Sequence, residues 1–179
     1  MAKKIIFLDR DGVINEEVGY LHKIRDFEFI DGVFESLKKL QDLGYEFIVI
    51  TNQSGIGRGF YTEKDYHKVD KWMKDQFKKK SIKILFSIHC PHLEEDNCNC
   101  RKPKPGMIEK CFKKYEISKK ASWVIGDSER DIEAGISSGI SNTILLRSGH
   151  RINELETKAF SIADSIKDIT KIIDSKMTP

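Results

Sequence analysis

The sequence predicts an α/β protein: a three-layer, Rossmann-like fold in which helices cover both faces of a parallel sheet, with no large cap domain. Residues 5–8 are four consecutive apolar residues, a run typical of a strand buried on both faces. A helical pattern over 33–40 leads to a second apolar run at 45–50, and this order predicts a right-handed crossover between parallel strands. Polar residues follow these strands, at the end of such sheets where ligands bind.

Length and composition are those of one ordinary globular domain. We expect a single domain over 1–179, with a small cysteine-containing loop inserted at 89–101. The net charge of +3 is too small to indicate a nucleic-acid partner. The sequence contains no long apolar segment that would indicate a signal peptide or a membrane span. We therefore expect a cytoplasmic protein with no membrane partner, and we expect it to be a monomer.

The first strand ends in two carboxylates, Asp9 and Asp11, with Gly12 behind them. Gly12 allows a sharp turn, so the two acids can converge on one reacting atom. A solvated turn is the ordinary explanation of an isolated Asp-x-Asp-Gly. Here three further polar clusters follow it, at 51–55, 101–106 and 126–131.

The first half of the chain continues with a loop or short hairpin at 16–30, expected over the tip of the sheet. Asp31 is predicted to cap the first helix, which ends at Gly44. After the second strand, the glycines at 55, 57 and 59 free backbone N–H groups that suit phosphate oxygens. Thr62, with Asp65 three residues on, predicts the start of a helix. The apolar stripe of that helix is Tyr66, Val69, Met73 and Phe77.

The second half alternates strands and helices in the same way. Strands are predicted at 82–89, 123–126 and 143–146, with an edge strand at 160–163. Pro105 suits the start of a helix that buries Cys111, and another helix is predicted over 128–139. After a polar loop at 147–157, Asp164 is predicted to cap the last helix. The inward residues of that helix are Ile166, Ile169 and Ile173.

Three thiols and one imidazole lie within eleven residues: Cys90, His92, Cys98 and Cys100. Together they make a complete tetrahedral ligand set for zinc. Because four protein ligands leave no coordination position for water, we expect such a metal to have a structural role and not a catalytic one. Two disulfides or buried free thiols are the alternatives, and the lack of an export signal favours metal.

The ordered set of motifs resembles the haloacid-dehalogenase-like phosphohydrolases over nearly the whole chain. The four motifs are Asp9-Arg10-Asp11-Gly12, Thr51 to Gly55, Arg101-Lys102 and Gly126-Asp127. Within that superfamily, residues 7–15, 19–22, 27–32 and 51–59 are similar to D-glycero-D-manno-heptose 1,7-bisphosphate phosphatases. This resemblance implies hydrolysis of the 7-phosphate of a small phosphorylated sugar, in the biosynthesis of ADP- or GDP-heptose.

The resemblance also implies a role for each motif. Asp9 is expected to form an aspartyl-phosphate, while Asp11 protonates the leaving sugar oxygen and then activates water. Thr51 and Lys102 are expected to stabilise the phosphoryl oxygens. Catalytic Mg²⁺ is expected on Asp9, the Asp11 backbone carbonyl and Asp127, with Asp131 steadying the site. The implied substrate-binding residues are Glu17, Val18, Gly19, Tyr20, Thr51, Asn52, Gln53, Ser54, Arg101 and Lys102.

One position departs from the family pattern. Many members place a lysine directly after the metal-binding aspartate, where this chain has Ser128. Arg101 is expected to hold the second phosphate, and Lys104, Arg130 and Arg147 are candidates to replace the missing lysine.

Three alternative functions follow from the same motifs. A nucleic-acid 3′-phosphatase is the most distant of them and is disfavoured by the small net charge. Histidinol-phosphate phosphatases share the aspartate core and the zinc loop, although residues 51–59 and Gly19-Tyr20 favour the heptose enzyme. An inactive, zinc-stabilised binding module is the alternative of another class. The intact residues at all four motifs argue against it.

Overall fold

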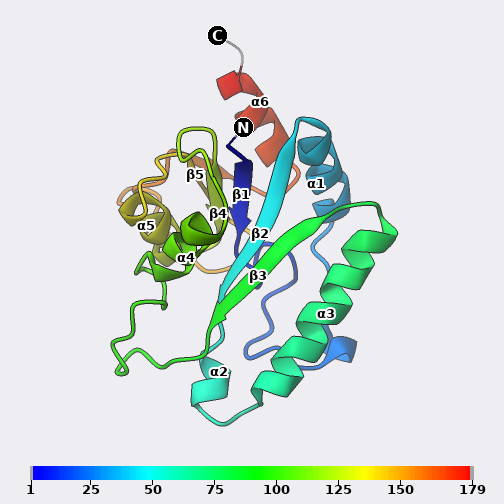
Figure 1. Ribbon diagram of the computed structural model, residues 1–179, viewed down its shortest axis with the longest axis vertical. Coiled ribbons are helices and arrows are strands. Elements are labelled where there is room, and N and C mark those ends of the chain that lie inside the picture. Colours follow the sequence, from blue (N-terminus) through cyan, green and yellow to red (C-terminus); the bar gives the residue numbers. More distant parts are fainter. Residues whose placement is uncertain (1, 178–179) are drawn as a thin grey trace.

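A six-stranded, fully parallel sheet organises the computed structural model, which describes residues 2–177 (Figure 1). The strand order is β3-β2-β1-β4-β5-β6, so β1 lies inside the sheet between β2 and β4. The strands are β1 (Lys4–Leu8), β2 (Tyr45–Asn52), β3 (Ile84–Cys90), β4 (Trp123–Gly126), β5 (Thr143–Leu146) and β6 (Ser161–Ala163). The predicted edge strand is therefore at an edge.

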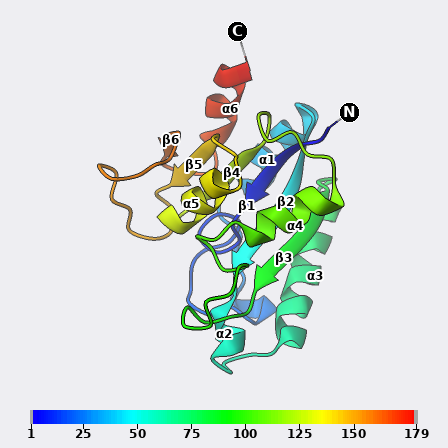
Figure 2. The ribbon, with the colours of Figure 1, turned by 60° about the vertical axis from the view of Figure 1, so that its left-hand side comes forward.

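Helices cover both faces of the sheet, as predicted (Figure 2). The helices are α1 (Val33–Asp42), α2 (Ser54–Gly57), α3 (Glu63–Lys79), α4 (Gly106–Lys114), α5 (Glu129–Ser137) and α6 (Ile169–Met177), with a 3₁₀ turn at Ile24–Asp26. Side chains of β1 alternate between two cores. Ile6 and Leu8 pack with α1, α3 and α6, whereas Ile5 and Phe7 pack with α4 and α5. Burial on both faces explains why the sequence of β1 shows no polar alternation.

The predicted start of α3 is confirmed. The Thr62 side chain accepts from the Asp65 N–H, and the Asp65 carboxylate accepts from the Thr62 N–H, a complete capping box. The predicted inward stripe of this helix is buried, and so is Cys111 in α4.

The two predicted acidic caps are wrong. Gly32, in the left-handed conformation at φ 83°, is the N-cap of α1, and Asp31 pairs with Lys167. Asp164 pairs with Arg147 at 2.5 Å, and α6 begins only at Ile169. In both cases a cation from a distant part of the chain takes the carboxylate, and a local sequence pattern does not contain that cation.

The observed boundaries of some elements differ from the predicted ones. Strand β2 runs two residues further than predicted, so Thr51 and Asn52 belong to its carboxyl end. The glycine-containing turn that follows contains the short helix α2.

The direction of chain progression across the sheet reverses at β1, because β2 and β3 extend to one side of it and β4 to β6 to the other. Open α/β sheets bind ligands at such a reversal. Every helix in the described part of the chain is too short or too polar to span a lipid bilayer.

Candidate active site

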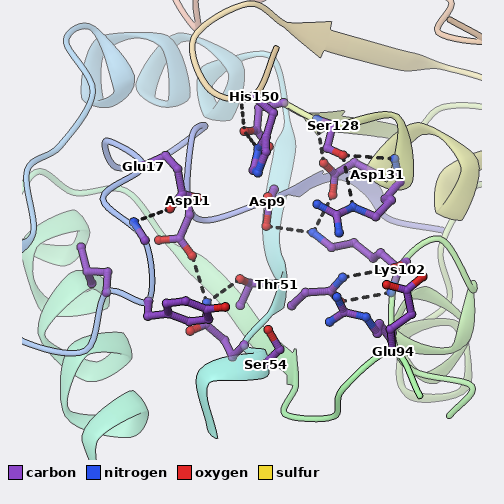
Figure 3. Close-up of a pocket in the computed structure, with 18 of the residues that line it drawn as sticks. Asp9, Asp11, Glu17, Thr51, Ser54, Glu94, Lys102, Ser128, Asp131 and His150 are labelled. Atoms are coloured by element: carbon purple, nitrogen blue, oxygen red, sulfur yellow. Dashed lines mark hydrogen bonds and ion pairs between the residues drawn. The ribbon is translucent and has the colours of Figure 1, made fainter. Parts of the chain in front are cut away.

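A cavity of about 400 Å³ lies at the carboxyl ends of β1, β2 and β4 (Figure 3). It is lined mainly by charged and polar groups, contributed by every predicted motif except the cysteines. The lining residues are Asp9, Asp11, Glu17, Gly19, Tyr20, Leu21, Thr51, Asn52, Gln53, Ser54, Arg58, Tyr61, Glu94, Arg101, Lys102, Asp127, Ser128, Arg130, Asp131 and His150. The sequence motifs, which are far apart in the chain, therefore meet at one surface.

Gly12 brings the end of β1 against the end of β4. Its φ is +80°, and a Cβ atom at this position would lie 2.3 Å from Asp127 Oδ2. A side chain here would be strained and would also displace the Asp127 carboxylate. The expected turn is present, and its close approach to Asp127 requires glycine.

Three carboxylates form one group in the cavity. One oxygen from each of Asp9, Asp127 and Asp131 lies within 4.8 Å of the other two. Asp127 is fully buried, and its Oδ1 has no hydrogen-bond partner among the described residues. Burying a carboxylate oxygen without a partner costs free energy unless a cation binds to it. Carboxylate oxygens are ligands that suit Mg²⁺. The site thus fits the expected metal, with Asp131 placed beside Asp9 and Asp127.

Burial raises the pKa of Asp9 to about 6, although Lys102 acts in the opposite direction. Burial likewise raises the pKa of Asp127 and that of Asp131. These shifts share one physical cause, because removal from water disfavours the charged form of a carboxylate. A divalent cation among the three groups would favour their ionised forms.

Lys102 lies between two of these acids. Its Nζ is 2.8 Å from Asp9 Oδ1 and 2.5 Å from Asp131 Oδ1, and it donates to the Ile50 carbonyl at 2.9 Å. Burial alone would lower the pKa of Lys102, but Asp131 and Asp9 hold it above its ordinary value. Lys102 is therefore a fixed cation beside the proposed nucleophile.

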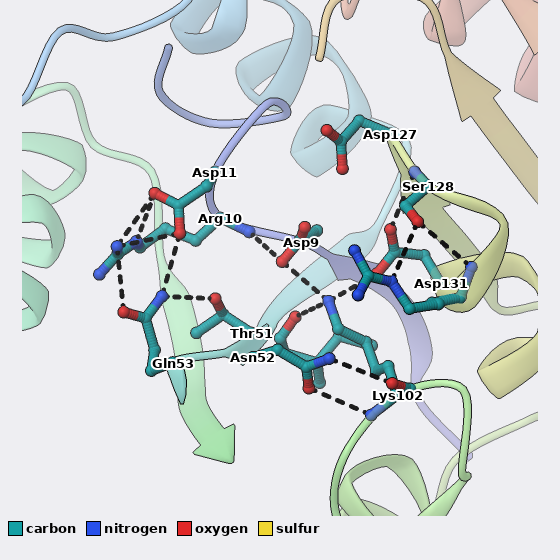
Figure 4. Close-up of polar contacts among 12 residues, drawn as sticks. Asp9, Arg10, Asp11, Thr51, Asn52, Gln53, Lys102, Asp127, Ser128 and Asp131 are labelled. Carbon is teal, nitrogen blue, oxygen red and sulfur yellow. Dashed lines mark hydrogen bonds and ion pairs between the residues drawn. The ribbon is translucent and has the colours of Figure 1, made fainter. Parts of the chain in front are cut away.

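Asn52 positions the backbone of Lys102 (Figure 4). Its Nδ2 donates to the Lys102 carbonyl, and its Oδ1 accepts from the Lys102 N–H, both at 3.1 Å. The sequence predicts substrate binding at Asn52. In the structure the Asn52 side chain lies at the cavity wall, and one N–H and the oxygen of its amide are hydrogen-bonded to the Lys102 backbone.

Asp11 lines the cavity, but its side chain is outside the group of three carboxylates. Arg10 holds both carboxylate oxygens at 3.0 Å through Nη2, and Asn15 donates to Oδ1 at 2.9 Å. Gln53 donates to Oδ2 at 3.0 Å. Asp11 is thus positioned by three neighbours. Sequence reasoning did not identify Arg10 or Asn15, although Arg10 stands between the two motif acids.

His150 is a further site residue that the sequence did not reveal. Its ring Nδ1 lies 2.6 Å from Asp127 Oδ2, and its backbone N–H donates to the same oxygen at 2.9 Å. The hydrogen bond with Asp127 raises the pKa of His150. Ser148 in the same loop donates to the Gly12 carbonyl at 2.8 Å. This segment was predicted only as a polar loop, and composition alone gives no signal for such contacts.

The predicted substrate loop borders the cavity. Glu17, Gly19 and Tyr20 line it, as does Ser54, and the Glu17 carboxylate accepts from the Gly19 N–H at 2.7 Å. Val18 is 53% exposed and is not among the lining residues.

The side chains of Cys90, His92, Cys98 and Cys100 gather at the end of β3, whose last residue is Cys90. Their S–S distances are 3.2–3.5 Å, and His92 Nδ1 lies 3.3 and 3.6 Å from two of the sulfurs. All four cysteines are free thiols in the structure, and Cys111 lies outside the group, so the arrangement does not match the two-disulfide alternative. Tetrahedral zinc with Zn–S bonds of about 2.3 Å needs S–S distances near about 3.8 Å, so the group requires only a small expansion.

Two arginines, Arg101 and Arg130, line the cavity. Arg101 donates to the His92 carbonyl at 3.3 Å, and Arg130 Nε donates to Ser128 Oγ at 3.3 Å. The other candidate cations are engaged elsewhere, since Lys104 binds Asn97 and Arg147 pairs with two acids of its own region. Arg130 is thus the candidate that the structure brings to the site.

Comparison with known proteins is consistent with this geometry. A model of HAD-hydrolase-like proteins matches residues 99–172. The chain is 46% identical to D-glycero-alpha-D-manno-heptose-1,7-bisphosphate 7-phosphatase of Photorhabdus laumondii, over 96% of this chain and 97% of that protein. It is 39% identical to D-glycero-beta-D-manno-heptose-1,7-bisphosphate 7-phosphatase of Pasteurella multocida, with the same coverage of both chains.

Among solved structures, the fold is similar to D,D-heptose 1,7-bisphosphate phosphatase from B. bronchiseptica, crystallised with magnesium and phosphate. The TM-score is 0.85 at 23% identity, and the match covers 97% of this chain and 99% of that one. At this identity the likeness supports the fold alone.

Proposed function

Because the chain belongs to the D-glycero-D-manno-heptose-1,7-bisphosphate 7-phosphatase family of HAD-like hydrolases, we propose that it removes the 7-phosphate of this sugar bisphosphate. The reaction would serve heptose biosynthesis. One observation carries the proposal: Asp9, Lys102, Thr51 and Asp127 line a single cavity at the carboxyl ends of three parallel strands.

The chemistry begins with Asp9, whose carboxylate oxygen attacks phosphorus. The bond between phosphorus and the sugar oxygen breaks, and Asp11, as general acid, gives a proton to that oxygen. A water molecule then attacks the aspartyl-phosphate and transfers a proton to Asp11, which releases phosphate and restores Asp9. An alkoxide is a poor leaving group, so a second acid accelerates the first step, typically by about 10²–10⁴-fold.

Around the phosphoryl group, Lys102 and the Thr51 hydroxyl offer a cation and a donor to the oxygens on which charge develops. Asp9 and Asp127 would hold Mg²⁺, together with the Asp11 backbone carbonyl and with Asp131 alongside. The ion supplies charge neutralisation, without which three carboxylates would repel a phosphate.

Zinc has a separate, structural role in this proposal. Cys90, His92, Cys98 and Cys100 would bind it, and the last ligand directly precedes Arg101 and Lys102. A metal that holds Cys100 would therefore also fix the position of the backbone from which the Arg101 and Lys102 side chains extend. The metal would order the loop and take no part in bond breaking.

The second phosphate of the substrate needs its own cations. Arg101 and Arg130 both line the cavity and have no carboxylate partner among the described ion pairs. A guanidinium binds phosphate oxygens through two parallel N–H groups. Arg130 would therefore supply the positive charge that Ser128 lacks.

A phosphate-release panel tests the proposed function. The substrates are heptose 1,7-bisphosphate, histidinol phosphate and a DNA 3′-phosphate, each with Mg²⁺ and with a chelator. We expect Mg²⁺-dependent release from the heptose substrate and none from the Asp9→Asn variant. Preference for histidinol phosphate would reassign the substrate, and no release from any compound would favour the inactive binding module.

A further inference from the structure

Gln53 occupies an unusual position between two groups of the proposed mechanism. It follows β2 directly, and its backbone N–H donates to the Cys90 carbonyl at 2.7 Å, which fixes it against the end of β3. Although Gln53 lines the cavity, its residue is only 3% exposed. The sequence predicts substrate binding at this residue, yet the polar atoms of its side chain are directed at protein groups.

The contacts of the side-chain amide determine its orientation. Oε1 accepts from the Tyr61 hydroxyl at 2.5 Å and from Arg10 Nη2 at 3.3 Å. An arginine can only donate, so the amide atom that faces it must be the oxygen. Burial raises the pKa of Tyr61 to about 12, which keeps its hydroxyl protonated.

Both amide hydrogens then point at the reaction machinery (Figure 4). Nε2 donates to Thr51 Oγ1 at 2.8 Å and to Asp11 Oδ2 at 3.0 Å. Because Thr51 Oγ1 accepts this hydrogen, the Thr51 hydroxyl proton is free to be donated elsewhere. Thr51 is 1% exposed and lines the cavity, so the phosphoryl oxygens are a suitable acceptor.

We infer that Gln53 is a positioning residue whose side-chain amide is oriented by Tyr61 and Arg10. The amide directs the Thr51 hydroxyl toward the phosphoryl group and at the same time holds the Asp11 carboxylate in place. One amide thereby couples phosphate binding to acid–base catalysis. The inference rests on the proposed function, since it assigns Thr51 and Asp11 the roles given there.

Kinetics and phosphate binding of four variants test this role. Gln53→Met keeps the side-chain length but removes the amide, and Tyr61→Phe removes only the hydroxyl that orients it. The third variant combines both changes. Gln76→Met makes the same chemical change on α3, outside the residues that line the cavity. Each Mg²⁺-loaded protein is assayed with heptose 1,7-bisphosphate and titrated with inorganic phosphate by calorimetry.

For Gln53→Met we expect kcat to fall by about 10–100-fold, the cost of a misplaced acid–base group. Inorganic phosphate should bind about 3–10-fold more weakly, as for one lost neutral hydrogen bond. KM should rise no more than phosphate affinity falls. Tyr61→Phe should give a smaller loss of both kinds, and the double variant should resemble Gln53→Met alone, because the two residues act through one amide. Gln76→Met should match the wild type.

Unchanged kcat in Gln53→Met would overturn the inference. A rise in KM alone would also do so, because it would indicate direct substrate contact. Additive losses in the double variant would show that Tyr61 does not act through Gln53. If Gln53→Met fails to fold, Tyr61→Phe decides by itself: wild-type kcat and wild-type phosphate affinity would contradict the coupling. Failure of the proposed function is distinguishable, because it abolishes heptose turnover in the wild type but leaves the phosphate-binding comparison to decide on Gln53.

Discussion

At the level of single residues, three carboxylates share a buried space, and this determines the response of the metal-free protein to pH. The pKa of Asp9 rises from 3.8 to about 6, and those of Asp127 and Asp131 are also raised. Between the unfolded and folded values, the folded chain binds more protons than the unfolded chain. The contribution of these acids to the free energy of unfolding therefore decreases as pH rises through that window.

The Asp127→Asn variant tests this point. Without metal, at about pH 7, we expect it to melt about 2–4 °C above the wild type, a shift that corresponds to about 1 kcal/mol in a domain of this size. The difference should shrink as the pH is lowered, because the raised pKa values of these carboxylates let the folded wild type take up protons before the unfolded chain does. Mg²⁺ should raise the melting temperature of the wild type more than that of the variant. An equal response of both proteins to Mg²⁺ would argue against Asp127 as a ligand.

Arg130 provides a second prediction at this scale. Arg130→Ala should raise KM for heptose 1,7-bisphosphate by about 5–10-fold, a modest loss because the side chain is solvent-exposed. KM for the heptose 7-monophosphate should not change, since that compound lacks the second phosphate. Steady-state kinetics with both substrates measure the effect. Arg25→Ala, a change in an exposed arginine away from the cavity, is the control. Equal losses with both substrates would show that Arg130 does not act on the second phosphate.

At the level of elements, the loop after β3 links the cluster of three cysteines and His92 to Lys102, the cation of the proposed mechanism. Lys102 is two residues from Cys100, and Asn52 of β2 holds its backbone from the other side. The loop is thus tied to the sheet at one point and to the cysteine cluster at another. Loss of zinc should loosen only the second connection.

Cys98→Ser tests this arrangement. We expect zinc, measured by native mass spectrometry, to be lost, and KM to rise because Arg101 is no longer fixed. The melting temperature should fall as well, since a structural metal stabilises the fold that binds it. Cys111→Ala is the matched control, because it alters a buried cysteine outside the cluster and should retain zinc. Full zinc occupancy in Cys98→Ser would refute this ligand set.

The same scale shows which elements the sequence reveals. Local patterns predicted α3, because Thr62, Asp65 and the apolar stripe lie within one helix. They failed for Asp31 and Asp164, whose partners Lys167 and Arg147 are distant in sequence. They also missed α2, since four residues are too few for a helical period.

At the level of the whole molecule, the parallel sheet explains how much of the site was predictable. Parallel strands place their carboxyl ends at one edge, so Asp9, Thr51 and Asp127 had to approach one another once β1, β2 and β4 were neighbours. The orientation of side chains was not predictable in the same way. His150 reaches Asp127 from a loop without periodicity, and the amide of Gln53 is oriented by Tyr61 and Arg10. These contacts depend on tertiary packing.

The central claim is that phosphoryl transfer passes through Asp9. Its most direct test is mass spectrometry of the chain after acid quenching during turnover of heptose 1,7-bisphosphate with Mg²⁺. We predict that the peptide containing Asp9 gains the mass of one phosphoryl group, and that Asp9→Asn shows neither this adduct nor phosphate release. Phosphate release by Asp9→Asn at a rate close to that of the wild type would contradict the account.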